Sequence, residues 1–351
     1  MIVALAKEEQ LVEMEMMSSL TERLPRETIF ARVYWTAHKW PQMTWGIAGK
    51  VLLISSDLVR DWSFAELVPD QIKDVEGGEI AVPKGLDGRC ASIRTDPRST
   101  LKYVPRRKSV SELVRQPEHA LVLCYFPGIE RLPEEKNEIA ALFLEVEREL
   151  AFWESYVTAL FDCVFRESVS PVTPAVCRTP DDTGAAELSL TASFHTGHER
   201  GAITLEEMQA GLGQLDKALR EEPEPETLRL SLHWYGRAIS ESVRADQFLF
   251  YYIAYEVLAG EKKGRTNHGH FRKELFEVLS MDTGGTSKAA TTLREIKDRR
   301  NDLVHRGDQD SPFPTQTLKR CVRTVLLKRL RLDEDQEVLS GLRTDLLRGT
   351  P

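Results

Sequence analysis

Short apolar runs separated by polar turns characterise the first 200 residues of the chain. Residues 120–126 form a continuous apolar run that favours a buried strand, and residues 51–54 form a second one. Residues 187–194 alternate apolar with small or polar side chains, a pattern typical of a half-buried strand. Apolar residues recur at helical spacing over residues 133–166, which predicts one long helix. The region is therefore predicted to mix α and β structure.

Helical spacing replaces these strand signals after Gly201. The polar residues 179–184 and the charged, proline-bearing residues 221–225 have the composition of linkers. A helix is predicted over residues 204–219. Beyond the second linker the pattern predicts five or six helices and almost no strand. These helices are predicted over residues 225–242, 245–259, 269–280, 287–305, 314–331 and 333–347.

Together the patterns predict an α+β protein, in which an N-terminal mixed α/β domain precedes an all-α bundle. The expected parts are residues 1–200, a helix and linker at 201–224, and a helical domain at 225–351. A chain of 351 residues suits two or three domains of ordinary size. The N-terminal part is expected to sense a ligand or to bind a regulatory protein.

Composition narrows the class of protein. Hydrophobic residues make up 41% and charged residues 29% of the chain, as in ordinary soluble domains. No apolar run is long enough to predict a membrane helix. The N-terminus turns acidic at Glu8 and has no basic start, so no secretory signal is predicted. The five cysteines are widely spaced, which favours reduced thiols and a cytoplasmic location.

Charge is unevenly distributed along the sequence. The formal net charge of −8 disfavours broad binding of nucleic acid. The segment 294–331, however, contains eleven Lys or Arg residues against five Asp or Glu residues. Such a local basic stretch can still hold a phosphate backbone.

An arginine followed by a histidine after four or five residues occurs four times, so context has to choose among the pairs. The pairs are Arg32/His38, Arg265/His270, Arg299/His305 and Arg300/His305. Only the last two lie in a predicted helix inside the basic stretch.

Arg300 lies in line with the predicted apolar stripe of its helix, because it follows Ile296 by four residues and precedes Val304 by four. A guanidinium in that position keeps its charge and has to find acceptors. Asn301 and His305 are also four residues apart and share the adjacent face. An arginine, an amide and an imidazole are thus expected to project toward one region.

The predicted helix 245–259 offers a partner for Arg300. From Phe248 to Leu258 its apolar and aromatic side chains leave almost no polar face, which indicates a central helix, and Glu256 is the one charge among them. A buried carboxylate needs a cation, so we expect Glu256 to pair with Arg300 and to fix its orientation.

At this point the sequence resembles a known family. The run Ala-Tyr-Glu-Val-Leu ending at Leu258, and the run Arg-Asn-Asp-Leu-Val-His-Arg-Gly starting at Arg300, resemble the HEPN superfamily, nearest its ApeA-like branch. The resemblance covers residues 225–332. The family signature is an arginine and a histidine with four to six residues between them, the first of which, directly after the arginine, is polar. Arg300, Asn301 and His305 occupy those positions.

The resemblance implies a metal-independent endoribonuclease without a cofactor, with its site formed where two such helices meet across a homodimer. Many relatives act as toxins or in antiviral defence. A histidine can act as general base near neutral pH, and an arginine can stabilise charge on a phosphorane. The residues expected to contribute are Arg300, Asn301 and His305 in catalysis, Glu256, Arg299 and Asp302 in support, and Arg294, Lys297 and Arg306 in RNA binding.

Structural interpretations stand beside these functional ones. Arg300 and Glu256 can form a salt bridge and do nothing more, and a histidine near a helix C-terminus is favoured by the helix dipole. The helical domain can equally be a non-catalytic dimerisation or RNA-binding module, acting as a subunit of a larger assembly.

Overall fold

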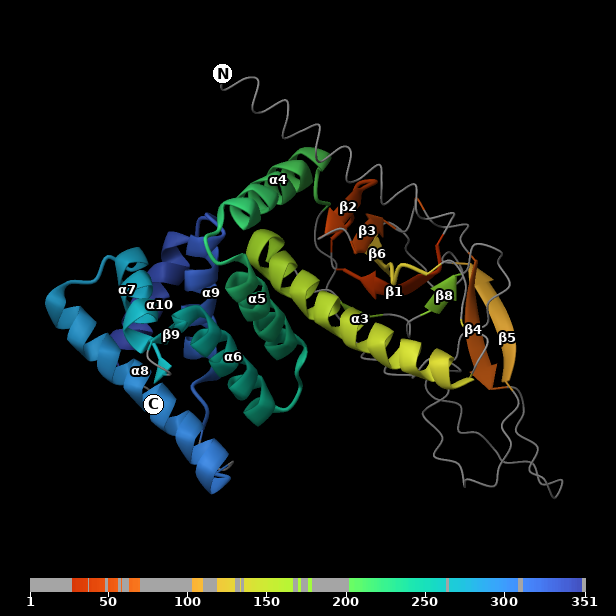
Figure 1. The fold of residues 1–351 in the computed structure, drawn as a ribbon. Helices are drawn as coiled ribbons and strands as arrows, with labels where there is room; N and C mark the ends of the chain where they lie inside the picture. The colour runs from red at the N-terminus through yellow and green to blue at the C-terminus, as the bar shows by residue number, and fades with distance from the viewer. Residues whose placement is uncertain are drawn as a thin grey trace. The chain divides into compact units, whose positions relative to one another are not determined.

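A computed structural model of the chain separates it into two units by their internal contacts. One unit comprises Met1–Leu150 with Val169–Leu205, and the other comprises Ala151–Ser168 with Glu206–Pro351. The long helix α3 (Lys136–Phe165) confirms the helix predicted over 133–166 (Figure 1). The division between the two units falls within this helix. The residues described are 27–36, 38–47, 50–55, 58, 63–69, 103–109, 119–129, 133, 136–166, 170–171, 176–178, 202–262, 265–308 and 312–348.

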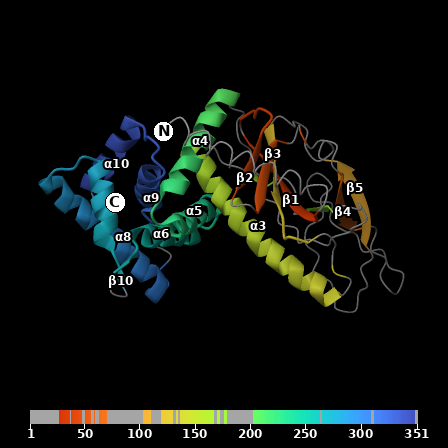
Figure 2. The ribbon, with the colours of Figure 1, turned by 45° about the horizontal axis from the view of Figure 1, so that its top comes forward.

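The first unit contains a sheet whose strand order is β2-β3-β6-β1-β8-β4-β5, with β7 paired to β1. Figure 2 shows β4 beside β5 at the end of this order. Every strand pair described in this sheet is antiparallel. The strands are β1 (Ile29–Trp35), β2 (Thr44–Ile47), β3 (Val51–Ser55), β4 (Ser63–Pro69), β5 (Tyr103–Ser109), β6 (Ala120–Tyr125), β7 (Ser170–Pro171) and β8 (Val176–Arg178).

The apolar runs of the sequence form the centre of this sheet. Strand β6 lies between β3 and β1, and all six of its residues are buried, because a central strand is covered on both faces. Val122 pairs with Val33 on one side and with Ile54 on the other. The strands predicted at 120–126 and 51–54 are thus confirmed as β6 and β3. The strand predicted at 187–194 lies outside the described residues.

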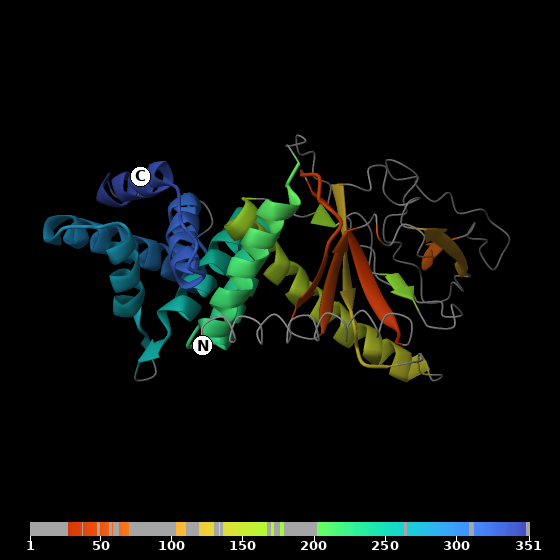
Figure 3. The same cartoon turned by 90° about the horizontal axis from the view of Figure 1, so that it is seen from above.

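The second unit is helical, apart from a small hairpin of β9 (Glu261–Lys262) and β10 (Arg265–Thr266). The predicted all-α bundle is confirmed in outline, and the hairpin is the exception to it. Figure 3 shows the helices from above, with the last two in dark blue. They are α4 (Leu205–Glu221), α5 (Pro225–Ser240), α6 (Arg244–Ala259), α7 (His268–Val278), α8 (Thr283–Arg306), α9 (Thr315–Arg329) and α10 (Gln336–Arg348).

Helix α6 is central to this unit, as its apolar sequence predicts, since it contacts α5, α7, α8 and α9. Pro225 begins α5 at a position where a missing N–H costs nothing, and Gly260, with φ of 67°, ends α6. No helix among the described residues is both long enough and apolar enough to cross a membrane.

The unit boundaries differ from the expected domains in two respects. Helix α4 corresponds to the helix predicted over 204–219, which was assigned to the connecting part 201–224. It buries Met208, Leu212 and Leu215 and belongs to the helical unit from Glu206 onward. The second half of α3, expected in the N-terminal domain, also belongs to the helical unit. Its side chains pack against α5, which no pattern within α3 itself could indicate.

Candidate functional site

Residues 300–305 form the last turns of α8, and both ends of that helix are capped. The Asp282 side chain accepts a hydrogen bond from the Gly285 amide at 2.6 Å and so caps the N-terminus. At the other end Gly307 adopts a left-handed conformation with φ of 67°. Its amide donates to the carbonyl of Leu303 at 3.1 Å, and the Asp308 amide donates to that of Asp302 at 3.4 Å. This double closure holds the motif in regular helix up to Arg306.

The buried stripe of α8 differs from the predicted one at its C-terminal end. Leu293, Ile296 and Leu303 are buried as expected, but Val304 is 48% exposed. Seven residues after Ile296 the helix has turned back to within roughly 20° of it, whereas eight residues bring the side chain roughly 80° away. Leu303 therefore completes the stripe, and the expectation for Val304 was wrong.

Arg300 is held by three neighbours. Its Nη2 lies 3.8 Å from Oε2 of Glu256, its Nη1 donates to Oδ1 of Asn301 at 3.3 Å, and its Cζ stands 5.5 Å from the ring centre of Tyr252. The predicted partnership with Glu256 is confirmed. The predicted burial is not, because the side chains of Arg300 and Glu256 are 29% and 30% exposed. A guanidinium that is both held and accessible can meet a ligand.

Asn301 and His305 lie one turn apart on α8. Asn301 is half-buried and receives the hydrogen bond from Arg300. His305 is exposed, and within the described part of the chain its ring forms no hydrogen bond or ion pair. The structure thus joins Glu256, Arg300 and Asn301 by contacts and leaves the imidazole accessible at the end of the helix.

Arg299 was expected to support the site, but its side chain is engaged elsewhere. It pairs with the Asp308 carboxylate at 2.8 Å, donates to the Pro312 carbonyl at 3.3 Å and lies 4.4 Å from the ring centre of Phe313. Only 11% of it is exposed. Neighbours in a helix point about 100° apart, so Arg299 fastens the segment after α8 while Arg300 faces α6.

The remaining predicted residues lie on the exposed side of α8. Arg294, Lys297 and Arg306 are all exposed. Arg306 pairs with Asp302 at 3.0 Å across one helical turn, so these two residues largely satisfy each other. Lys297 precedes Asn301 by one turn and extends the polar face toward the start of the helix.

Aromatic contacts join the site to α7, and only some of them were predictable from the sequence. The rings of Tyr252 and Tyr255 lie 5.3 Å apart in α6, and the Tyr255 ring stacks on His268 at 5.5 Å. The Tyr255 hydroxyl is 2.7 Å from Nδ1 of His268, within hydrogen-bond distance. The tyrosine-rich sequence of α6 is evident, but its meeting with His268 depends on the intervening hairpin.

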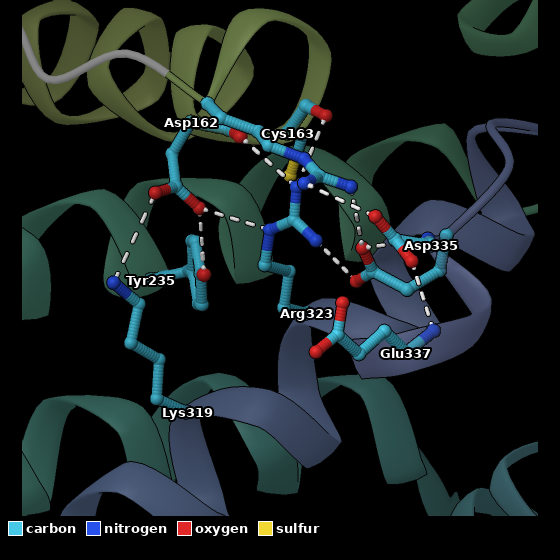
Figure 4. Close-up of polar contacts among 9 residues, drawn as sticks. Asp162, Cys163, Tyr235, Lys319, Arg323, Asp335 and Glu337 are labelled. Atoms are coloured by element: carbon cyan, nitrogen blue, oxygen red, sulfur yellow. Dashed lines mark hydrogen bonds and ion pairs between the residues drawn. The ribbon is translucent and has the colours of Figure 1, made fainter. Parts of the chain in front are cut away.

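A second polar cluster occupies the helical unit and serves structure (Figure 4). Arg323 of α9 donates to the Asp162 carboxylate at 3.3 Å and to the carbonyls of Asp162 and Cys163 at 3.2 and 3.4 Å. Its other terminal nitrogen contacts Glu334. The last turn of α3 contains no basic residue, so Arg323 satisfies carbonyls that α3 itself leaves open. Tyr235 also donates to Asp162, at 2.8 Å.

Within the described residues no three His, Cys, Asp or Glu side chains are grouped as metal ligands. The polar groups at the end of α8 can bind an anion through Arg300 and exchange a proton through His305.

Comparison of the chain with protein families, curated proteins and solved structures gives no match.

Proposed function

We propose that the protein is a metal-independent RNA endonuclease of the HEPN type. The observation that carries the proposal is the arrangement of Arg300, which Glu256 and Asn301 orient while about a third of it stays exposed. The accessible imidazole of His305 follows Asn301 by one turn. This is the residue order in which the sequence resembles HEPN ribonucleases.

The chemistry proceeds by internal attack on the phosphodiester. Neutral His305 removes the proton of a ribose 2′-hydroxyl, whose oxygen then forms a bond to the adjacent phosphorus. Arg300 stabilises the negative charge on the non-bridging oxygens. The bond from phosphorus to the 5′-oxygen breaks, and that oxygen takes up a proton. The products carry a 2′,3′-cyclic phosphate and a 5′-hydroxyl.

The proposal includes a homodimer through the helical unit. A second copy would bring its own His305 to protonate the leaving oxygen, so that one histidine acts as base and the other as acid. Under this proposal the sheet-containing unit binds a regulatory protein or ligand, and the enzyme acts as a toxin or in antiviral defence. The mass of the protein in solution tests the homodimer, and the toxicity of its expression tests the toxin or defence role.

A non-catalytic RNA-binding or dimerisation module is the second candidate. The contact of Arg300 with Glu256 is equally compatible with it, since a purely structural ion pair would show the same geometry. The two candidates differ in what they require of His305. Catalysis needs its imidazole, whereas a binding module does not.

The deciding experiment compares wild type, His305→Ala and Arg300→Ala on labelled mixed-sequence RNA in EDTA, with analysis of the product ends. His270→Ala is the matched control, because His270 is another exposed histidine of the same unit. Cleavage by wild type and control alone, with cyclic phosphate ends, is the expected result. Equal cleavage by His305→Ala would refute the catalytic role, and RNA binding without cleavage would favour the module.

A further inference from the structure

A continuous series of contacts leads from the candidate site to the start of α7. Arg300 lies over Tyr252, Tyr252 contacts Tyr255, and Tyr255 stacks on His268. Both tyrosines are buried. They form a rigid base beneath the surface and fix the position of His268 relative to the motif.

Positive charge acts on His268 from its own helix α7 and from α8. Arg272, one turn later in α7, donates from Nε to the His268 carbonyl at 3.3 Å. The pKa of His268 is lowered from its usual value, first by burial and then by the positive charges of Lys297 and Arg272. Among the described residues, the charged or titratable groups that act on the imidazole are therefore Tyr255 of α6, Arg272 of α7 and Lys297 of α8.

Among the described residues, these two cations differ from their neighbours, which pair with carboxylates. Glu256 pairs with Arg300, Asp302 with Arg306, and Glu274 with Arg329 at 3.2 Å. Within the part of the chain that the structure describes, no carboxylate forms an ion pair with Arg272 or Lys297. Lys297 is exposed and Arg272 half-buried, so solvent reaches both. Solvent-accessible cations without carboxylate partners attract anions.

We propose that His268, Arg272 and Lys297 form a phosphate-binding subsite for the RNA strand, adjoining the site at Arg300. The inference rests on the proposed function, because it supplies the path of the substrate away from the motif. Lys297 and Asn301 are four residues apart in the helix, about 6 Å along the axis. The strand would pass from His305 along α8 to the start of α7.

Binding and catalysis can be tested separately in a His305→Ala background. We would measure the affinity for a labelled single-stranded RNA of mixed sequence by fluorescence anisotropy, over a range of salt concentrations. The plot of log affinity against log salt has a negative slope, and each lost phosphate contact makes this slope shallower by about 0.7 for single strands. The double variant with Arg272→Ala and Lys297→Ala should bind more weakly at every salt concentration, and its slope should be shallower by about 1.4.

Lys273→Ala is the matched control, since Lys273 is exposed, adjacent to Arg272 in α7, and its charge acts on Glu277 instead. We expect it to bind RNA like its parent. A double variant that binds like the control, with an unchanged melting temperature, would overturn the subsite. So would a parent that binds no RNA.

Acidity gives an independent measurement. Protonation of His268 below its lowered pKa adds a positive charge to the subsite, so affinity should rise as pH falls from 7.5 to 5.5. His268→Asn, which keeps a partner for the Tyr255 hydroxyl, should lose part of this rise, while His270→Asn should keep it. An equal rise in both variants would contradict the assignment of His268.

The outcomes separate this inference from the proposed nuclease. Salt-dependent binding that needs Arg272 and Lys297, together with no cleavage by wild type, would leave the subsite standing and reject the catalysis. Cleavage by wild type, with RNA binding unaffected in the double variant, would leave the nuclease standing and reject the subsite.

Discussion

Gly236 of α5 lies so close to the backbone carbonyl oxygen of Ser155 in α3 that a β-carbon at Gly236 would overlap that oxygen. The atoms on the Ser155 side are backbone and cannot rotate away. Tyr235, the preceding residue, is fully buried, and its hydroxyl donates a hydrogen bond to the Asp162 carboxylate of α3. The two helices are thus in direct backbone contact within the helical unit.

Replacing Gly236 by alanine should therefore destabilise the helical unit. Overpacking of this kind usually costs about 1–3 kcal/mol or more, because one helix has to shift. Chemical denaturation would measure the loss. Gly213→Ala is the matched control, since a β-carbon at this position of α4 meets nothing within 4 Å. There alanine should stabilise by about 0.5–1 kcal/mol, and equal effects of the two variants would contradict the close contact.

Removal of the Arg323 side chain should be more damaging than removal of an exposed arginine from the same helix. Arg323→Ala leaves Asp162 and Glu334 with their main cation gone, in surroundings where their side chains are 17% and 3% exposed. Breaking a buried ion pair in this way costs about 3–5 kcal/mol.

Arg320→Ala supplies the comparison for Arg323. Arg320 pairs with Asp345 at 2.6 Å, but both side chains are more than a third exposed, so its loss should cost at most about 1 kcal/mol. The free energies of unfolding of both variants can be read from urea titrations. Similar values for the two would show that the Arg323 cluster adds little.

Arg300→Ala should cost little stability, in contrast to the expectation from a buried pair. Arg300 and Glu256 are partly exposed and 3.8 Å apart, so their pair should contribute about 1 kcal/mol or less. Under the proposed function the same variant should abolish RNA cleavage. Thermal unfolding and the cleavage assay on one preparation test both, and a loss of cleavage explained by unfolding would contradict the proposal.

His233 makes the stability of the helical unit depend on pH. Burial is the main cause that lowers its pKa, and the charge of Arg237 adds to it, against the opposing hydrogen bond to the Phe152 carbonyl at 3.3 Å. The folded protein therefore resists protonation of His233, whereas the unfolded chain accepts a proton near pH 6.5. Its contribution is present above that pH and is lost as the pH falls below it.

The melting temperature should accordingly fall between pH 7.5 and pH 5, with His268 acting in the same direction. His233→Asn keeps a donor for the Phe152 carbonyl and removes the titration, so its melting temperature should depend less on pH than that of wild type. Parallel curves for the two proteins would exclude His233 as a source of the dependence.

Local pattern predicted much of the helical unit. The tyrosine-rich run of α6 indicated a central helix, and Glu256, the one carboxylate between Phe248 and Leu258, indicated a partner for Arg300; both expectations are confirmed. Strands β3 and β6 were predictable for a similar reason, because a continuous apolar run is stable only when both faces are covered.

The sequence by itself determined the long helix α3, the helices after Gly201, the apolar strands β3 and β6, and the face of α8 that carries the motif, because periodicity and apolar runs record burial along one element. Only the tertiary structure decided which elements meet. It turned Arg299 to Asp308, and it brought His268 onto Tyr255 across the hairpin. It also placed the second half of α3 in the helical unit, through the contact of Ser155 with Gly236. Such pairings depend on backbone approach and on loop paths, which side-chain periodicity does not encode.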